Sequence, residues 1–292
     1  MDKTHTHPVL IAGCGYVGSQ LARILESGDR EYIALSLSGK SSGPLQSEVL
    51  SCNLSDLAAL ARLSQEIPRP SVIAHCASSN RGGSDAYRAV YLCGVENLLS
   101  TFPDSRLFFT SSTSVYGQTD GSLVTEESPV EPERGTSQIL RQTEDIVLAN
   151  RGTVLRLSGI YGPGRCIYLQ RLLDNSATIE PDTVSRYLNQ IHRDDAAAAI
   201  AHLMQQAKDE VSGQIYNVTD GHSQTQRECY ESLAGFFDRQ LPPEAQPVEG
   251  SKRARTHRRI SNDKLTATGW NPRYSTLLDA LEKDADLVPS FI

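Results

Sequence analysis

Short runs of almost wholly apolar residues alternate with longer amphipathic stretches over the first 160 residues of the chain. Such runs, rich in valine, isoleucine and phenylalanine, predict buried β-strands. The stretches between them repeat apolar residues at helical spacing, and in 88–99 Val90, Tyr91, Val95, Leu98 and Leu99 would share one buried face. The predicted strands are 8–13, 32–37, 71–77, 106–112 and 153–159, and the predicted helices are 17–27, 57–67, 85–102 and 137–150.

Strands that are apolar throughout and separated by helices predict a doubly wound parallel α/β sheet covered on both sides. After residue 160 the pattern loosens into a helix-like stretch at 166–175, an alanine-rich helix at 194–207 and one further strand at 214–220. We therefore expect two interleaved units. The sheet domain would take 1–165 plus 186–220, and a smaller C-terminal substrate-binding unit would take 166–185 plus 221–292.

Composition and charge narrow the class of protein. The chain has 292 residues and a net charge of −7, which argues against an extended nucleic-acid surface. No window approaches the roughly 18 consecutive apolar residues of a membrane span, and the first ten residues lack the apolar core of a secretory signal. The six cysteines form no CxxC pair, and no metal-ligand pattern occurs. We expect a cytoplasmic protein with reduced thiols and neither a nucleic-acid nor a membrane partner.

The glycines Gly13, Gly15 and Gly18 form a GxGxxG motif directly after the first predicted strand and at the start of the first predicted helix. In that context they provide a tight turn, close approach of the backbone to a pyrophosphate, and close packing of helix on strand. The helix N-terminus adds free N–H groups for the phosphates. We expect this loop, with Tyr16 and Val17, to bind a dinucleotide.

The end of the second predicted strand bears on which dinucleotide binds. An acidic residue there would accept a hydrogen bond from the ribose 2′-hydroxyl and repel a 2′-phosphate. No acid occurs between Glu31 and Glu48, whereas Ser38 and Lys40 could receive a 2′-phosphate. The sequence therefore favours NADP over NAD, with Lys40 as a solvated loop cation being the other interpretation.

Several further motifs follow in a fixed order along nearly the whole chain, and together with the glycine loop they resemble the extended short-chain dehydrogenase/reductases, the NAD-dependent epimerase/dehydratase family. The resemblance implies a Rossmann sheet. The motifs are GCGYVG at 13–18, CNLSD at 52–56, HCAS at 75–78, GVEN at 94–97, TSSTSVYG at 110–117, LRLSGIYGPGR at 155–165, NQIHRDDAA at 189–197, YNVTDG at 216–221 and SNDKLTATGWNP at 261–272.

The resemblance also implies roles for single residues. Asn53 and Leu54 would flank the adenine, and Ser112 would hydrogen-bond the substrate oxygen. The chemistry of the family is hydride transfer between a nicotinamide and a sugar-like carbinol carbon. The remaining residues that would contact the cofactor are Cys76, Ala77, Ser78, Thr110 and Ser111.

The chain departs from the family pattern at the acid/base pair, a tyrosine with a lysine four residues later on one helix face. None of its eleven tyrosines has a lysine at that spacing. Aligned on Gly135 and Ser137, the two positions hold Arg134 and Gln138, and aligned on Glu144 they hold Thr136 and Leu140. Neither alignment supplies an acid or base near neutral pH.

Two functions follow from this departure. The first is an NAD(P)-dependent oxidoreductase or epimerase acting on a sugar-like or other carbonyl substrate, with a non-standard acid/base. Tyr116 is one candidate for that role, and the sequence favours the other interpretation, a packing aromatic in its turn. The second is a catalytically inactive NADP(H)-binding sensor or regulatory protein.

A basic cluster lies near the C-terminus, at Lys252, Arg253, Arg255, Arg258 and Arg259. Such a run is commonly a solvated face. Arg255 and Arg258 could alternatively bind a phosphorylated or nucleotide-linked sugar, because guanidinium groups match phosphate geometry. The oligomeric state stays open, with a homodimer as one alternative.

Overall fold

The computed structural model describes residues 7–80, 82–181, 185–246 and 256–291. The chain divides into two compact, interleaved units, each formed from three segments. The first unit consists of Met1–Val115, Val130–Arg156 and Ala196–Tyr216, and the second of Tyr116–Pro129, Leu157–Asp195 and Asn217–Ile292. Within the described ranges, no helix is long and apolar enough to cross a membrane.

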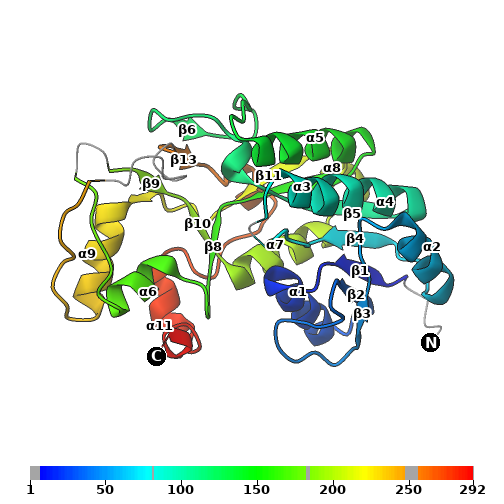
Figure 1. The fold of residues 1–292 in the computed structure, drawn as a ribbon, viewed down its shortest axis with the longest axis horizontal. Helices are drawn as coiled ribbons and strands as arrows, with labels where there is room; N and C mark the ends of the chain where they lie inside the picture. Colours follow the sequence, from blue (N-terminus) through cyan, green and yellow to red (C-terminus); the bar gives the residue numbers. More distant parts are fainter. Residues whose placement is uncertain (1–6, 81, 182–184, 247–255, 292) are drawn as a thin grey trace. The chain divides into compact units, whose positions relative to one another are not determined.

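A seven-stranded sheet of order β11-β7-β5-β4-β1-β2-β3 is the centre of the fold (Figure 1). The β1–β2, β1–β4, β2–β3 and β4–β5 pairs are all parallel. Strands β1 and β4 are buried along their whole length, as their unbroken apolar sequences predict. The bounds are β1 Val9–Ala12, β2 Tyr32–Ser36, β3 Val49–Ser51, β4 Val72–His75, β5 Arg106–Ser112, β7 Thr153–Leu157 and β11 Ile215–Val218.

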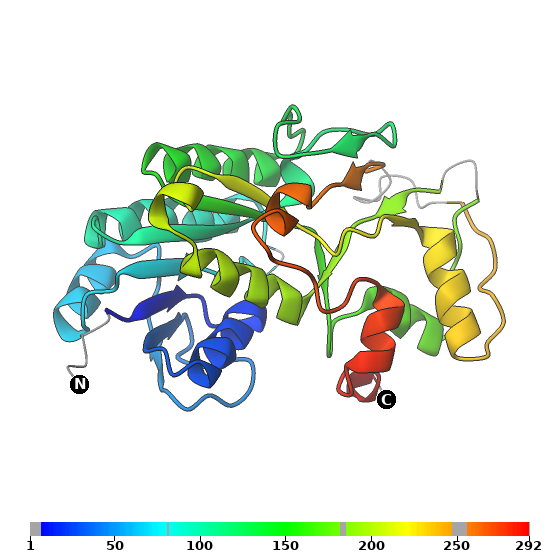
Figure 2. The same cartoon turned by 180° about the vertical axis from the view of Figure 1, so that it is seen from behind.

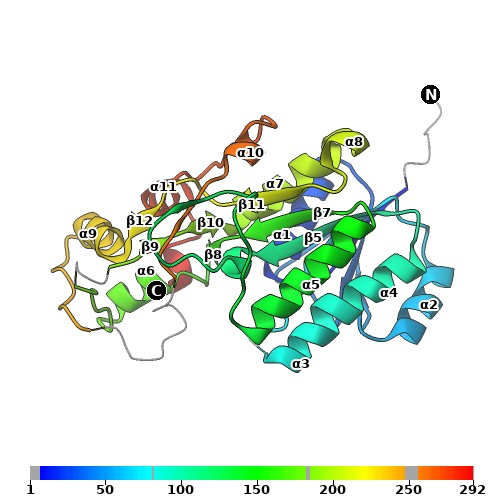
Figure 3. The same ribbon diagram turned by 90° about the horizontal axis from the view of Figure 1, so that it is seen from above.

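Helices cover both faces of this sheet. Helices α2, α4 and α5 lie side by side over one face (Figure 3), and α1 and α7 lie over the other (Figure 2). Asp56 caps α2 by accepting a hydrogen bond from the Ala59 backbone at 3.0 Å. The bounds are α1 Tyr16–Ser27, α2 Leu57–Glu66, α3 Ser84–Tyr87, α4 Gly94–Thr101, α5 Gly135–Ala149, α7 Arg193–Gln205 and α8 Lys208–Val211.

The register of the central strands brings their carboxyl ends to one edge. Ala12 of β1 lies opposite His75 of β4, and His75 lies opposite Phe109 of β5. The strand order reverses between β1 and β4, which are neighbours although β2 and β3 separate them in the sequence. In doubly wound sheets, ligands bind outside the carboxyl ends at such a switch point.

The second unit is built from short strand pairs and helices around its own core. Strands β8 and β10 pair in parallel, β9 and β12 antiparallel, and β6 and β13 in parallel. Helix α9 begins with a capping box in which Thr225 and Glu228 bond each other's backbone N–H groups. The bounds are β6 Leu123–Val124, β8 Gly159–Tyr161, β9 Tyr187–Leu188, β10 Gln190–His192, β12 Gln224–Thr225, β13 Arg259–Ile260, α6 Ile167–Leu173, α9 Gln226–Phe236, α10 Asp263–Thr266 and α11 Leu277–Lys283.

The predicted doubly wound α/β sheet is confirmed, and each of the six predicted strands forms. Two features differ from the sequence prediction. The predicted helix 85–102 contains a π-helical segment, Arg88–Cys93, between α3 and α4. The limits of the two units also differ, because 116–129, 157–165, 186–195 and 217–220 belong to the second unit, where β8 pairs with β10 outside the central sheet.

Candidate functional site

The glycine loop runs from the end of β1 to the start of α1, and its backbone is tightly held. The Gly13 and Cys14 N–H groups both donate to the Leu35 carbonyl, at 3.0 and 2.6 Å. Gly13 has a φ of +111°, and a Cβ there would lie 2.2 Å from the Ala77 nitrogen. A Cβ on Gly18 would lie 2.1 Å from the Gly13 oxygen. Both positions therefore require glycine.

Gly15 is different, because a Cβ there would meet no atom within 4 Å. The residue is exposed and precedes α1, a helix with no acidic residue in its first turn and no side-chain hydrogen bond at its N-cap. The open space beside Gly15 at the N-terminus of α1 forms a cradle that fits a pyrophosphate. Tyr16 and Val17 begin this helix.

The loop after β2 carries Ser38 and Lys40, both exposed. Ser19 ties this loop to the glycine loop, since its hydroxyl donates to the Cys14 carbonyl at 2.9 Å and accepts from the Ser42 N–H at 2.9 Å. Arg23 of α1 donates to the Ser42 carbonyl at 3.0 Å. The structure thus brings Ser38 and Lys40 to the same edge of the first unit as the glycine loop.

The ends of β3, β4 and β5 supply the other predicted cofactor residues. Asn53 is exposed, and its side chain accepts from the Ser55 N–H at 3.1 Å, whereas Leu54 is buried. Cys76 is buried and Ser78 is exposed. Burial raises the pKa of Cys76 to about 12, so it is a neutral thiol at physiological pH. Thr110 donates to the His75 carbonyl at 2.8 Å and so joins β5 to β4.

Three serine hydroxyls form a line from β5 to α5. The Ser112 hydroxyl accepts from the Ser114 N–H at 3.1 Å, and the Ser137 hydroxyl lies 3.2 Å from that of Ser114. Ser112 is half-buried at the carboxyl edge of the sheet. This position agrees with its predicted role of orienting a substrate oxygen, which stays a prediction.

Helix α5 carries the residues that stand where an acid/base pair would be expected. Arg134 is its N-cap residue, and Gln138 is exposed and donates to the Pro132 carbonyl at 3.1 Å. In the other alignment, Thr136 is half-buried and Leu140 packs in the core. No phenol or ammonium group stands at any of these four positions.

The match to a family model decides the relationship of this chain to known proteins. Residues 9–219 match the NAD dependent epimerase/dehydratase family. The chain belongs to this family. Protein YeeZ of Escherichia coli (strain K12) is 28% identical over 261 residues, which cover 84% of this chain and 89% of YeeZ.

Solved structures agree with this membership. A protein from Methylobacillus flagellatus, assigned to the NAD-dependent epimerase/dehydratases, is 27% identical with a TM-score of 0.78, and the match covers 98% of each chain. The UDP-glucose 4-epimerase of Thermus thermophilus, in complex with NAD, has a TM-score of 0.73 at 22% identity, covering 91% of this chain and 94% of that one. At that identity the second likeness shows the fold alone.

The sequence prediction missed a buried ion pair beneath the family's serine motif. The Arg156 guanidinium donates to Glu144 through Nε at 3.1 Å and Nη2 at 2.7 Å, and the Ser111 hydroxyl donates to the same carboxylate at 2.6 Å. Both charged side chains are almost fully buried. Because the three residues come from α5, β7 and β5, sequence spacing does not signal their pairing.

In the second unit, Tyr116 and Arg258 are both buried. The Tyr116 hydroxyl donates to Asn217 Oδ1 at 2.8 Å, an arrangement that suits the packing interpretation, and its use as an acid stays a prediction. Arg258 donates to the Gln118 carbonyl at 3.2 Å. Arg255, the other predicted substrate-binding residue, lies outside the described residues. Among the described residues, no group of three or more His, Cys, Asp or Glu side chains could hold a metal ion.

Asp195 gives the second unit a pH-dependent contribution to stability. Its carboxylate is buried and accepts hydrogen bonds from the backbone N–H groups of Arg273 at 2.8 Å and Tyr274 at 2.9 Å. Burial raises its pKa from 3.8 to about 6. Because its folded pKa exceeds the unfolded one, Asp195 binds more proton in the folded state in this range, and its contribution to stability is lost as pH rises from about 4 to 6.

The Asp195→Asn variant is expected to have a shallower fall of unfolding free energy across that range, because it removes one titrating carboxyl. Denaturant unfolding at several pH values between about 4 and 6 measures the slope. Asp220, whose pKa burial also raises, keeps part of the wild-type slope in the variant. Identical slopes in wild type and variant would contradict the assignment to Asp195.

Proposed function

We propose that this protein is an NADP(H)-dependent oxidoreductase or epimerase that acts on a carbonyl or carbinol carbon of a sugar-like substrate. The glycine loop carries the proposal, because Gly15 faces open space at the N-terminus of α1 while Gly13 and Gly18 admit no side chain. That combination fits a dinucleotide pyrophosphate. Family membership and an NAD complex of a structural neighbour support the binding of a nicotinamide dinucleotide.

Each of the following residues of the first unit would have its own role in binding the cofactor or the substrate. When bound, the nicotinamide donates or accepts a hydride. The N–H groups of α1 hold the pyrophosphate, and Ser38 and Lys40 hold a 2′-phosphate. The Ser112 hydroxyl donates a hydrogen bond to the substrate oxygen and so fixes the carbonyl carbon for hydride transfer.

Lys40→Ala is expected to weaken NADPH binding about tenfold or more and to leave NADH binding unchanged. The physical reason is that only NADPH carries the 2′-phosphate that the ammonium would bond, and a hydrogen bond to a charged group contributes about 1.5–3 kcal/mol. Calorimetric titration of wild type and variant with each cofactor measures the difference. Equal losses for both cofactors, or a wild type that binds NADH as well as NADPH, would contradict the NADP preference.

For the substrate, we propose a nucleotide-linked sugar. The structural neighbours include a UDP-glucose 4-epimerase from Thermotoga maritima with UDP-glucose. In the second unit, the Tyr187 and His257 rings are stacked 5.1 Å apart with an interplanar angle of 3°, and the Arg259 guanidinium lies 5.6 Å from the Tyr187 ring centre. Aromatic rings beside cations suit a base and its phosphates.

A panel of UDP- and dTDP-sugars, incubated with NADP⁺ or NADPH, tests this substrate class. Product analysis would detect epimers, and nicotinamide absorbance would detect net oxidation or reduction. Conversion of one member of the panel is the expected result. Conversion of simple ketones with no conversion of any nucleotide sugar would contradict the substrate class and leave the oxidoreductase proposal standing.

The absence of a tyrosine and lysine pair on α5 favours a second candidate, an NADP(H)-binding sensor without turnover. The two proposals differ in one observable. Either protein binds NADPH and shifts its unfolding curve with cofactor by mass action, but a sensor transfers no hydride to any carbonyl in the panel.

A further inference from the structure

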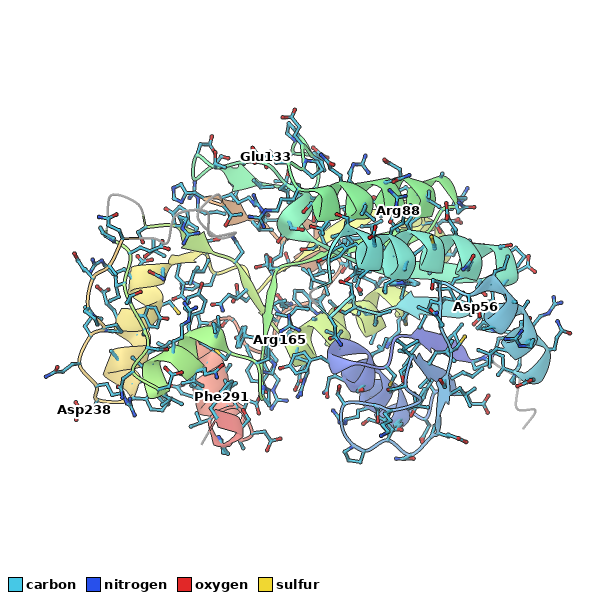
Figure 4. The ribbon with its side chains drawn as sticks, viewed as in Figure 1. Asp56, Arg88, Glu133, Arg165, Asp238 and Phe291 are labelled. Atoms are coloured by element: carbon cyan, nitrogen blue, oxygen red, sulfur yellow. The ribbon has the colours of Figure 1, made fainter. Side chains whose placement is uncertain are left out.

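The helix that follows β4 contains a π-helical segment, Arg88–Cys93, whose first residue is labelled in Figure 4. Such segments are rare and occur frequently at functional sites. His75 of β4 explains its position, because the ring Nε2 lies 3.0 Å from the Val90 carbonyl and donates to it. Burial lowers the pKa of His75 to about 4, so the ring is neutral.

Tyr91 lies within this segment and points toward the end of β4. Its ring is packed among Tyr87 at 4.9 Å, His75 at 5.9 Å and Phe109 at 6.2 Å between centroids. Ser78 and Ser79, which follow the end of β4, lie near enough to its hydroxyl to lower the pKa of the phenol. Burial raises the pKa of this phenol and Tyr87 adds to the rise, while the groups of Ser78 and Ser79 act in the opposite direction.

The position of this hydroxyl matters because β4 is one of the two strands at the switch point of the sheet. Ser78 and Ser79 follow β4 after Cys76 and Ala77, and the Ala77 backbone lies against Gly13 of the glycine loop that follows β1. The reacting part of a dinucleotide and its substrate bind beyond these strand ends. Tyr91 therefore brings a phenol to the edge where α5 supplies none. His75 is buried, neutral and already bonded to Val90, so it is a poor alternative.

We propose that Tyr91 is the proton-transfer residue of this protein, in place of the missing tyrosine and lysine pair; the inference rests on the proposed function. In reduction, a hydride from the nicotinamide adds to the carbonyl carbon, the π electrons of the C=O bond move to oxygen, and Tyr91 gives its phenolic proton to that oxygen. Ser78 and Ser79 then donate hydrogen bonds to the phenolate. In oxidation, the phenolate takes the carbinol proton as the hydride leaves.

The test follows the ionisation of Tyr91 itself rather than turnover. Protein labelled with monofluorinated tyrosine is titrated with base by fluorine NMR, alone and saturated with NADP⁺. The Tyr91 signal is identified by its absence in Tyr91→Phe. Because a positive charge close to an acid lowers its pKa by about 1–3 units, NADP⁺ is expected to shift this ionisation by about one unit or more. 2′-Phospho-ADP-ribose, which has no nicotinamide, should leave it unchanged.

Tyr87 is the matched control, since it is one helical turn away on the same helix and its ring contacts that of Tyr91. Its signal, identified with Tyr87→Phe, should move less than that of Tyr91. Suppose that NADP⁺ binds by calorimetry but the pKa of Tyr91 does not change, or changes equally with 2′-phospho-ADP-ribose. The role of Tyr91 is then refuted, and the proposed function stands. If no nicotinamide dinucleotide binds, the proposed function fails and the inference with it.

Discussion

Replacing Arg156 by methionine is expected to lower the free energy of unfolding by about 3–5 kcal/mol, because it removes the buried, bidentate partner of the Glu144 carboxylate. Arg156 and Glu144 are 1% and 0% exposed, so water cannot solvate the remaining charge. The Ser111 hydroxyl would still donate to that carboxylate, and the partly exposed Arg141 guanidinium lies 3.7 Å from it, but a neutral donor and a more distant cation do not replace a bidentate guanidinium. Denaturant unfolding followed by circular dichroism measures the loss.

A double variant distinguishes the stability lost by leaving a buried charge unpaired from the stability lost by changed packing. Glu144→Leu combined with Arg156→Met is expected to recover most of the lost stability, because removing both partners of a buried pair is often neutral. The matched surface control is Arg151→Ala, which breaks an exposed pair with Asp209 at 3.7 Å and should cost less than about 1 kcal/mol. A loss in Arg156→Met as small as in this control would refute the buried-charge argument.

Gly15→Ala is expected to abolish most dinucleotide binding while leaving the fold intact. The residue has a negative φ of −89°, and its Cβ would meet no protein atom within 4 Å. The added methyl group would occupy the space into which the pyrophosphate must come. We expect NADPH affinity to fall at least tenfold, which is about 1.4 kcal/mol of binding energy, measured by calorimetric titration.

Two other glycines give controls for this result. Gly235→Ala also adds a methyl group in open space, but on α9 of the second unit, and should bind NADPH as wild type does. Gly13→Ala should reduce both stability and binding, because its Cβ would collide with the Ala77 backbone. Wild-type affinity in Gly15→Ala would show that no phosphate approaches this part of the loop.

Local patterns in the sequence were sufficient for the elements of the sheet. The run RLFFTSS predicted β5 with its observed bounds, and its apolar centre, Leu107–Phe109, is buried in the sheet. The glycine loop was equally readable, since the steric requirements at Gly13 and Gly18 arise from a turn between adjacent elements. The three-residue strand β3 was not predicted, because a run that short carries no recognisable period.

The candidate site depended more on contacts between distant segments. His75 reads in the sequence as one more strand residue, yet its hydrogen bond to Val90 lies within a π-helical segment that the helical periodicity of 85–102 did not reveal. From its helical spacing, Tyr91 in turn was predicted to be a core residue of a helix. Its place against Ser78 and Ser79 follows only when that helix is packed on the end of β4.

By itself the sequence determined the doubly wound sheet, the dinucleotide loop and the membership of the epimerase/dehydratase family, because each follows from short-range spacing and motif order. Only the tertiary structure decided which polar groups meet. Glu144 finds Arg156 and Ser111 across three elements, and Tyr91 reaches the carboxyl edge of the sheet. The physical reason is that burial makes an unpaired polar group costly, so its partner is chosen by packing in space and not by distance along the chain.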